Sequence, residues 1–478
     1  MSDFHELLDK YDGTELASLV RQKEVQPKEL LETCIERIEK VDPSLNGIAE
    51  KLYDSAREAT YADGPFMGIP TLVKDLFAPI KEAKTTNGSL AVGGVRLGID
   101  DNHTSRLRGA GCVFVGTTTA PEFGTSYTTE SSLFGPTRNP WNTEHSCGGS
   151  SGGSAALVAA RALPFAHGND GGGSIRVPSS CCGIFGLKPT RGLVPSGPMV
   201  GEGWAGMSIA HALTLSVRDS AGLLDVAAGS DLGAPYAAPH QEESFVSSLS
   251  KPLRPLRIAM IDSLSPWPNS KEANLAQQHA AKLCEALGHH VTTAKLPVDL
   301  MTFFDRAFDI IGPNVKSYVE MIGNMSGSPV SDEALQPSTR IIIRDKGSIS
   351  AVQYVDAVTY MHGLGRIMAN FMQDYDVLLT PTLTRPPVKI GELNLQDDSK
   401  SIEEFIQLSH SYSPYTAIFN GTGQPAMSVP LYWTPDNLPL GAHFVGRFGE
   451  DATLLALAAQ LEQHQPWWNN RPPVNACR

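Results

Sequence analysis

Two glycine-rich segments carry serines whose type and spacing could support nucleophilic chemistry. They cover residues 147–154 and 167–178. Glycine is costly inside regular structure, so eight glycines in two short segments indicate a backbone that another group approaches closely. Such a backbone could cradle a phosphate, present a nucleophile on a sharp turn, or line an oxyanion hole. The eight are Gly148, Gly149, Gly152, Gly153, Gly168, Gly171, Gly172 and Gly173.

Phosphate binding is the first hypothesis for these segments. A phosphate-binding loop ends in Gly-Lys-Ser or Gly-Lys-Thr before a helix, and a dinucleotide-binding loop follows a strand as Gly-x-Gly-x-x-Gly. Neither pattern occurs here. The sequence therefore disfavours a nucleotide-binding function.

The second hypothesis is a nucleophile elbow, because residues 149–153 satisfy Gly-x-Ser-x-Gly literally. It would make Ser151 the nucleophile of an esterase with the α/β-hydrolase fold. The elbow also needs an Asp and a His from downstream loops. His443 falls within an expected strand, and His362 and His410 fall within helical patterns, so none of the three is well placed.

Acyl transfer by Ser174 is the third hypothesis. The N–H groups of Gly171, Gly172 and Gly173 directly precede this serine and could form an oxyanion hole. Each such donor stabilises the tetrahedral intermediate by about 3 kcal/mol. A serine nucleophile also needs a base, which the glycine-rich segments alone do not identify.

The sequence resembles the amidase signature family at its three landmark motifs, in the family's order and spacing. The family more often has Thr where this chain has Asn169, and a larger residue where it has Gly171. The version at residues 167–174, HGNDGGGS, is similar to a bacterial branch that includes the 6-aminohexanoate cyclic dimer hydrolases. The landmark motifs are residues 68–75, 148–154 and 170–190, and further similarity lies at residues 121–124, 135–140, 376–381 and 438–441.

The resemblance implies a Ser-cisSer-Lys triad. In it, Ser174 is the acyl-forming nucleophile, Ser150 is the bridging serine after a cis peptide bond, and Lys74 is the base. Lys74 ends the apolar run of residues 69–73, and burial lowers the pKa of a lysine so that it can accept a proton. Lys74 would take the proton of Ser150 while Ser150 takes that of Ser174. The relay then protonates the leaving amine, and water hydrolyses the acyl-enzyme by the same route.

Supporting roles are expected for three further residues. Ser151 and Asp170 would hydrogen-bond the glycine loops, and Arg176 would pair with an acid to fix the loop. No spacing of Cys and His suggests zinc, and neither a metal nor a cofactor is expected.

The resemblance implies hydrolysis of a linear or cyclic carboxamide, a C–N bond other than a peptide bond, with water as the acyl acceptor. Candidate substrates are 6-aminohexanoate cyclic dimers, aryl acylamides and urethanes. Substrate contacts are expected from residues 125–132, 304–318 and 411–419. An amidotransferase subunit that releases ammonia from glutamine is an alternative, although it usually has Gln where this chain has Val177. The intact catalytic positions disfavour an inactive binding module.

An α/β architecture must position these residues. Short apolar runs alternate with glycine-rich loops between residues 68 and 198, a pattern typical of layered α/β cores. The resemblance implies the amidase signature fold, a central mixed β-sheet covered by helices on both faces. We expect one domain over residues 1–478. It comprises N-terminal packing helices (1–65), a catalytic core (66–230) and the remaining sheet and pocket helices (255–478).

Composition limits the partners and the compartment. Of the 478 residues, 41% are apolar and 19% are charged, a balance typical of globular proteins. The formal net charge of −13 and the lack of a basic cluster argue against nucleic acid. No signal peptide or membrane-spanning apolar run is recognisable. Seven cysteines without a regular framework favour reduced thiols. We therefore expect a cytoplasmic enzyme, with a homodimer suggested by analogy to the family.

Overall fold

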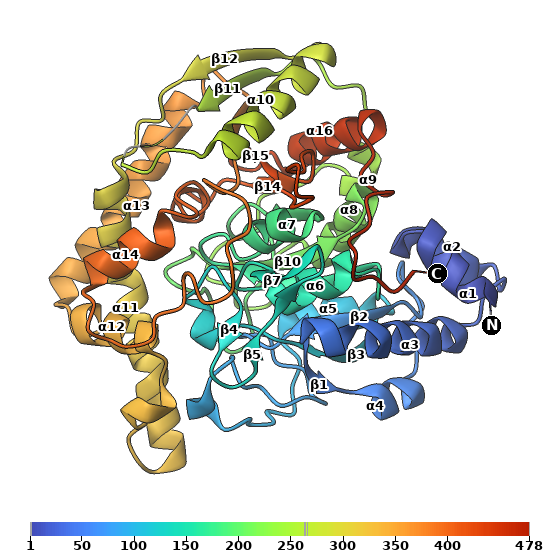
Figure 1. The fold of residues 1–478 in the computed structure, drawn as a ribbon, viewed down its shortest axis with the longest axis horizontal. Helices are drawn as coiled ribbons and strands as arrows, with labels where there is room; N and C mark the ends of the chain where they lie inside the picture. The colour runs from blue at the N-terminus through green and yellow to red at the C-terminus, as the bar shows by residue number, and fades with distance from the viewer. Residues whose placement is uncertain (1, 262–263, 265, 478) are drawn as a thin grey trace.

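A mixed eight-stranded β-sheet forms the centre of the computed structural model (Figure 1), which describes residues 2–261, 264 and 266–477. The strand order is β12-β11-β13-β15-β14-β9-β10-β8. β11 runs parallel to β12 and β13, and the other neighbouring pairs are antiparallel. The strands are β8 (Phe165–Asp170), β9 (Phe185–Lys188), β10 (Ile209–Thr214), β11 (Arg257–Ile261), β12 (His290–Ala294), β13 (Val377–Pro381), β14 (Ala426–Val429) and β15 (Ala442–Gly446).

A smaller sheet, with the order β1-β3-β2, lies beside β8. Its strands are β1 (Ile48–Lys51), β2 (Pro70–Lys74) and β3 (Val113–Thr118). Several hydrogen bonds connect the sheets, and two of them show the relative direction of β2 and β8. Thr71 Oγ1 donates to Phe165 O at 3.0 Å, and the Lys74 N–H donates to His167 Nδ1 at 3.3 Å. β2 and β8 therefore run side by side in the same direction, and their carboxyl ends, where Lys74 and Asp170 lie, come together.

Helices cover both faces of the large sheet, as the resemblance implied. Val377 and Leu379 of β13 pack into the core formed with α8 (Val217–Ala227), α10 (Lys271–Ala286) and α16 (Asp451–His464). Leu378 points the opposite way, into the core formed with α11 (Leu300–Ser326), α12 (Pro337–Lys346) and α13 (Ala351–Phe371). This alternation is what a strand buried on both faces requires. The predicted fold class is confirmed.

The remaining elements surround this frame, with the N-terminal helices on the side of the molecule away from α11–α14 (Figure 1). None of the helices in the described part of the chain has both the length and the apolar character needed to cross a membrane. These elements are α1 (Ser2–Lys10), α2 (Gly13–Arg21), α3 (Pro27–Leu45), α4 (Tyr53–Glu58), α5 (Asn102–Gly109), α6 (Gly152–Ala159), α7 (Arg176–Cys182), α9 (Phe245–Ser248), α14 (Ile402–His410), α15 (Ile418–Gly421), the 3₁₀ turns η1 (Leu90–Val92), η2 (Glu122–Gly124) and η3 (Asp332–Ala334), and the short strands β4 (Glu130–Ser131), β5 (Gly135–Pro136), β6 (Arg138–Asn139) and β7 (Asn142–Ser146).

Candidate active site

Lys74 ends β2 inside the protein, where its side chain is fully buried. Its Nζ atom lies 2.7 Å from Ser150 Oγ, 2.7 Å from Asn169 Oδ1 and 3.4 Å from Asn169 O. Burial lowers the pKa of Lys74 well below its ordinary value, although the charge of Asp170 acts in the opposite direction. This shift favours the neutral amine, which is the form of lysine that can accept a proton.

Asn169 determines which way that amine points. A neutral amine has two N–H donors and one lone pair, and Asn169 offers two oxygen acceptors to the donors. The lone pair is then left for the hydroxyl proton of Ser150. The orientation of the amide is fixed as well, because Asn169 Nδ2 donates to Leu76 O at 2.6 Å. The sequence singled out Asn169 only as a departure from the family pattern.

Ser150 lies between β7 and α6, and the Gly149–Ser150 peptide bond is cis. A Cβ atom at Gly149 would lie 2.7 Å from Thr128 O, so only glycine fits at this position. The next residue connects this segment to the second glycine-rich segment, because the Ser151 N–H donates to Ser174 O at 3.1 Å. The packing therefore brings the two glycine-rich segments together around Lys74.

Ser174 stands in the turn between β8 and α7 and lines a pocket. It is 6% exposed, and its hydroxyl has no hydrogen-bond partner among the residues that the structure describes. Gly173 before it has a φ of +137°, and a Cβ atom there would collide with the Thr416 side chain. A hydroxyl that is reachable from the pocket and has no partner among the described residues suits a nucleophile.

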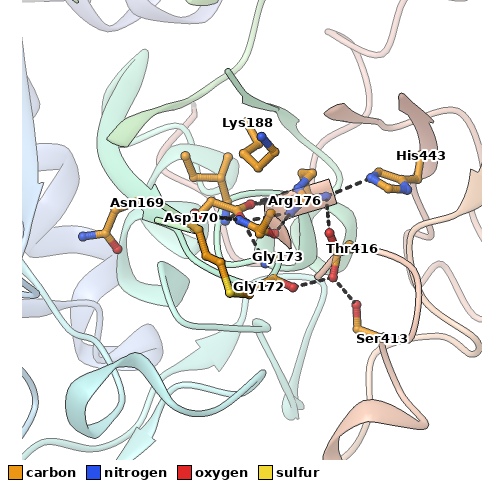
Figure 2. Close-up of polar contacts among 12 residues, drawn as sticks. Asn169, Asp170, Gly172, Gly173, Arg176, Lys188, Ser413, Thr416 and His443 are labelled. Carbon is orange, nitrogen blue, oxygen red and sulfur yellow. Dashed lines mark hydrogen bonds and ion pairs between the residues drawn. The ribbon is translucent and has the colours of Figure 1, made fainter. Parts of the chain in front are cut away.

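An ion pair between Asp170 and Arg176 holds this turn (Figure 2). Arg176 Nη2 donates to Asp170 Oδ1 at 2.8 Å and Nε donates to Oδ2 at 3.0 Å, and both side chains are fully buried. Asp170 also accepts the N–H groups of Gly173 at 2.7 Å and Ile175 at 3.1 Å. Burial raises the pKa of Asp170, but the charge and hydrogen bonds of Arg176 and the bond from Asn420 outweigh it and hold that pKa below its usual range.

Two peptide groups before Ser174 are oriented by side chains from distant segments. Asn420 Nδ2 donates to Asp170 O at 2.9 Å. The Gly172 carbonyl accepts from Thr416 Oγ1 at 2.6 Å and from the Tyr127 hydroxyl at 3.1 Å. The Gly173 N–H is already engaged by Asp170, whereas those of Gly171 and Gly172 donate to no acceptor within the described ranges. These two N–H groups are the available oxyanion donors of the predicted three.

A second buried lysine is close to the Asp170–Arg176 pair but is differently placed (Figure 2). Burial and the charge of Arg176 lower the pKa of Lys188. Its Nζ donates to Pro189 O at 2.7 Å. In the described part of the chain it makes no hydrogen bond to Ser150 or Ser174, so Lys74 is the better candidate for a base.

The elbow hypothesis finds no support in the geometry. Ser151 is fully buried, and its hydroxyl donates to Asn169 O at 3.3 Å. His443 contacts Arg176 and Thr380, His410 contacts Tyr127, and His362 is exposed on α13. No described histidine is hydrogen-bonded to Ser151.

The pocket in front of Ser174 uses all three expected substrate segments. Thr125, Ser126 and Tyr127 come from the first, and Ala417 comes from the third. The sequence reasoning missed Trp204, Met207, Ser409 and His410, which no local pattern marks. No cluster of His, Cys, Asp and Glu side chains in the described ranges could hold a metal ion. The members from the second segment are Phe304, Ala307, Phe308 and Ile311.

Comparison with known proteins matches residues 29–455 to the Amidase family. The chain is 35% identical over 478 residues to the 6-aminohexanoate-cyclic-dimer hydrolase of Paenarthrobacter ureafaciens, with 97% of this chain and 96% of that protein covered. A solved structure of a 6-aminohexanoate cyclic dimer hydrolase superposes with a TM-score of 0.92 at 34% identity, covering 97% and 99% of the two chains. A bacterial aryl acylamidase of the amidase signature family superposes with a TM-score of 0.87 at 28% identity, covering 97% and 98%.

Proposed function

Because this chain belongs to the amidase family, whose members here are amide hydrolases, we propose that it hydrolyses a linear or cyclic carboxamide through an acyl-enzyme on Ser174. The observation that carries the proposal is the environment of Lys74. A fully buried lysine amine lies 2.7 Å from Ser150 Oγ, with both of its other contacts made to Asn169 oxygens. This arrangement pairs a candidate base with the Ser150 hydroxyl, which in the proposed reaction passes a proton between Ser174 and Lys74.

In the proposed reaction, neutral Lys74 accepts the Ser150 proton while Ser150 accepts the Ser174 proton. The Ser174 oxygen attacks the amide carbon, and the N–H groups of Gly171 and Gly172 stabilise the oxyanion. Each donor is worth about 3 kcal/mol in the transition state. The protons then return through Ser150 to the leaving nitrogen, the C–N bond breaks, and water repeats the sequence on the ester.

The supporting residues act through the position of Ser174. Asp170 holds the Gly173 and Ile175 N–H groups, which stand on either side of the serine. Arg176 neutralises that carboxylate and reaches Thr416 O at 2.9 Å. We assign a positioning role to Asp170 and Arg176, since neither side chain contacts Ser150 among the described residues.

The substrate class is an uncharged amide. Every described residue that lines the pocket has an uncharged side chain at pH 7. An unpaired charge on the substrate would therefore be strongly disfavoured in this pocket. Cyclic dimers of 6-aminohexanoate, aryl acylamides and urethanes meet this condition. Free glutamine does not, because its ammonium and carboxylate groups would find no ion partner there. The cytoplasmic location, the single domain, the homodimer and the absence of nucleic-acid partners remain predictions from the sequence.

The test compares wild type with Ser174→Ala, Ser150→Ala and Lys74→Ala on aryl amides, aliphatic amides, cyclic 6-aminohexanoate dimer and free glutamine. We expect wild type to hydrolyse neutral amides and each variant to lose activity by several orders of magnitude. Lys84→Ala, at an exposed lysine, is the matched control and should retain full activity. A dead Ser151→Ala variant beside an active Ser174→Ala variant would establish the elbow instead, and glutamine as the preferred substrate would establish the amidotransferase.

A further inference from the structure

The acyl group of the substrate must occupy the pocket that Ser174 lines. The leaving amine departs to solvent, whereas the acyl group stays covalently attached to Ser174 until water releases it. One wall of this pocket is apolar and aromatic, formed by Trp204, Met207, Phe304 and Phe308. Against this wall, a polar side chain that reaches the pocket can decide which acyl groups are accepted.

His410, the last residue of α14, is such a side chain. Its ring packs on Phe304 with centroids 4.0 Å apart, and its edge contacts are with Phe308 at 5.6 Å and Tyr127 at 5.1 Å. These three rings fix the plane of the imidazole. Burial lowers the pKa of His410 to about 3, so the ring is neutral at physiological pH.

One ring nitrogen is engaged by the protein and the other is not. His410 Nδ1 lies 3.0 Å from the Tyr127 hydroxyl oxygen. Nε2 has no hydrogen-bond partner among the residues that the structure describes, and it is not among the fully buried polar atoms. The His410 side chain is partly exposed, and it lines the pocket. Nε2 is therefore available to a bound substrate.

The Tyr127 hydroxyl determines which tautomer His410 adopts. Its oxygen also lies 3.1 Å from Gly172 O, a carbonyl that can only accept. If the phenol proton pointed to His410, two oxygens would face each other at that distance with no proton between them. The phenol proton therefore goes to Gly172 O, and His410 Nδ1 donates to Tyr127. A neutral imidazole has a single N–H group, so Nε2 carries a lone pair and is an acceptor.

We propose that His410 Nε2 accepts a hydrogen bond from the acyl group, so that the preferred substrates carry a second, neutral N–H or O–H donor, such as a second amide. This inference rests on the proposed amide hydrolysis and names its substrate class more narrowly. An ammonium donor is disfavoured because no carboxylate lines the pocket in the described part of the chain. Binding of the donor also favours the Nδ1–H tautomer, which keeps Tyr127 bonded to Gly172 next to the oxyanion donors.

The test uses paired p-nitroanilides of N-acetyl-ω-amino acids with two to six methylene groups, each compared with its N-methyl analogue, which lacks the donor. At the best chain length we expect wild type to prefer the N–H member by about 10- to 100-fold in kcat/KM, the usual effect of leaving a buried acceptor unpaired. His410→Phe keeps the stacked ring and should reduce this ratio to about one. His410→Gln retains an acceptor and should restore part of the preference.

The wild-type comparison alone keeps the proposal falsifiable if His410→Phe does not fold. If wild type shows equal kcat/KM for the N–H substrate and its N-methyl analogue at every chain length, the role of His410 is refuted, while amide hydrolysis remains intact. A preference that survives in folded His410→Phe would also refute it, because another group would then be the acceptor. If wild type cleaves none of the anilides and none of the simple amides, the proposed function itself fails.

Discussion

Replacing Asn169 with Asp places a carboxylate where a neutral amide oxygen now lies 2.7 Å from Lys74 Nζ. At that distance and an effective dielectric constant of about 20, the attraction between carboxylate and ammonium is about 6 kcal/mol. Loss of carboxylate hydration and of the existing amide contact offsets much of it. We therefore expect a net increase of about 1–3 units in the pKa of Lys74.

The sign of the effect follows from the role of a base. Wild-type kcat/KM should rise with pH through the lowered pKa of Lys74 and then reach a plateau. In Asn169→Asp, Lys74 and the new carboxylate form a pair that binds a proton more tightly than Lys74 does in the wild type, whichever atom carries the proton. The rising limb of the kcat/KM profile should therefore move to higher pH. On the acid limb of the profile, activity should fall about 10- to 1000-fold, and it should recover toward high pH.

The assay is the pH dependence of kcat/KM for a neutral anilide, whose own groups do not titrate in the range. Asn169→Thr is the control, because threonine supplies an oxygen acceptor without charge. Its limb should stay where the wild-type limb lies, although its plateau should be lower. A limb that does not move in Asn169→Asp, combined with a uniformly lower plateau, would refute the assignment of Lys74 as the titrating base.

Two further substitutions test how the turn around Ser174 is held. Arg176→Met leaves the Asp170 carboxylate buried without its counter-charge, and we expect a loss of about 3–5 kcal/mol in the free energy of unfolding. Urea denaturation measures this loss. Arg254→Met is the control, since Arg254 is exposed and its ion pair should contribute at most about 1 kcal/mol. Equal losses of unfolding free energy in the two variants would contradict the argument. Thr416→Val removes the hydroxyl that donates to Gly172 O at 2.6 Å, and loosened oxyanion donors should lower kcat about tenfold with little change in KM. Steady-state kinetics decide the second case, and a raised KM with unchanged kcat would instead place Thr416 in substrate binding.

The sequence predicted those parts of the molecule that leave a local pattern. Strand β2 is marked by the apolar run that ends at Lys74, and the glycine-rich segments mark the turns near Ser150 and Ser174. Gly149 shows why such a signal is reliable, since a Cβ atom there would lie 2.7 Å from Thr128 O. A residue that is excluded by the backbone itself can be recognised without knowledge of its distant neighbours.

The residues that complete the site leave no such pattern. Asn420 and Thr416 follow Asp170 and Gly172 by 250 and 244 positions, yet they bond directly to the turn before Ser174. In the sequence, His410 falls within a helical pattern, and that pattern does not mark it as a pocket residue. Their roles arise when tertiary packing brings separate segments together, so they could be recognised only in the structure.

Charge balance predicts that Arg176 affects Lys74, a residue that it does not touch. The turn needs a carboxylate at Asp170 to hold two backbone N–H groups, but that charge also raises the pKa of Lys74. Arg176, at 2.8 Å, carries the opposite charge, so we expect it to offset part of the field of Asp170 at Lys74. Loss of Arg176 would therefore move the lysine toward its protonated form as well as weaken the fold. We therefore expect the same ion pair to hold the proposed nucleophile in place and to help keep the proposed base neutral.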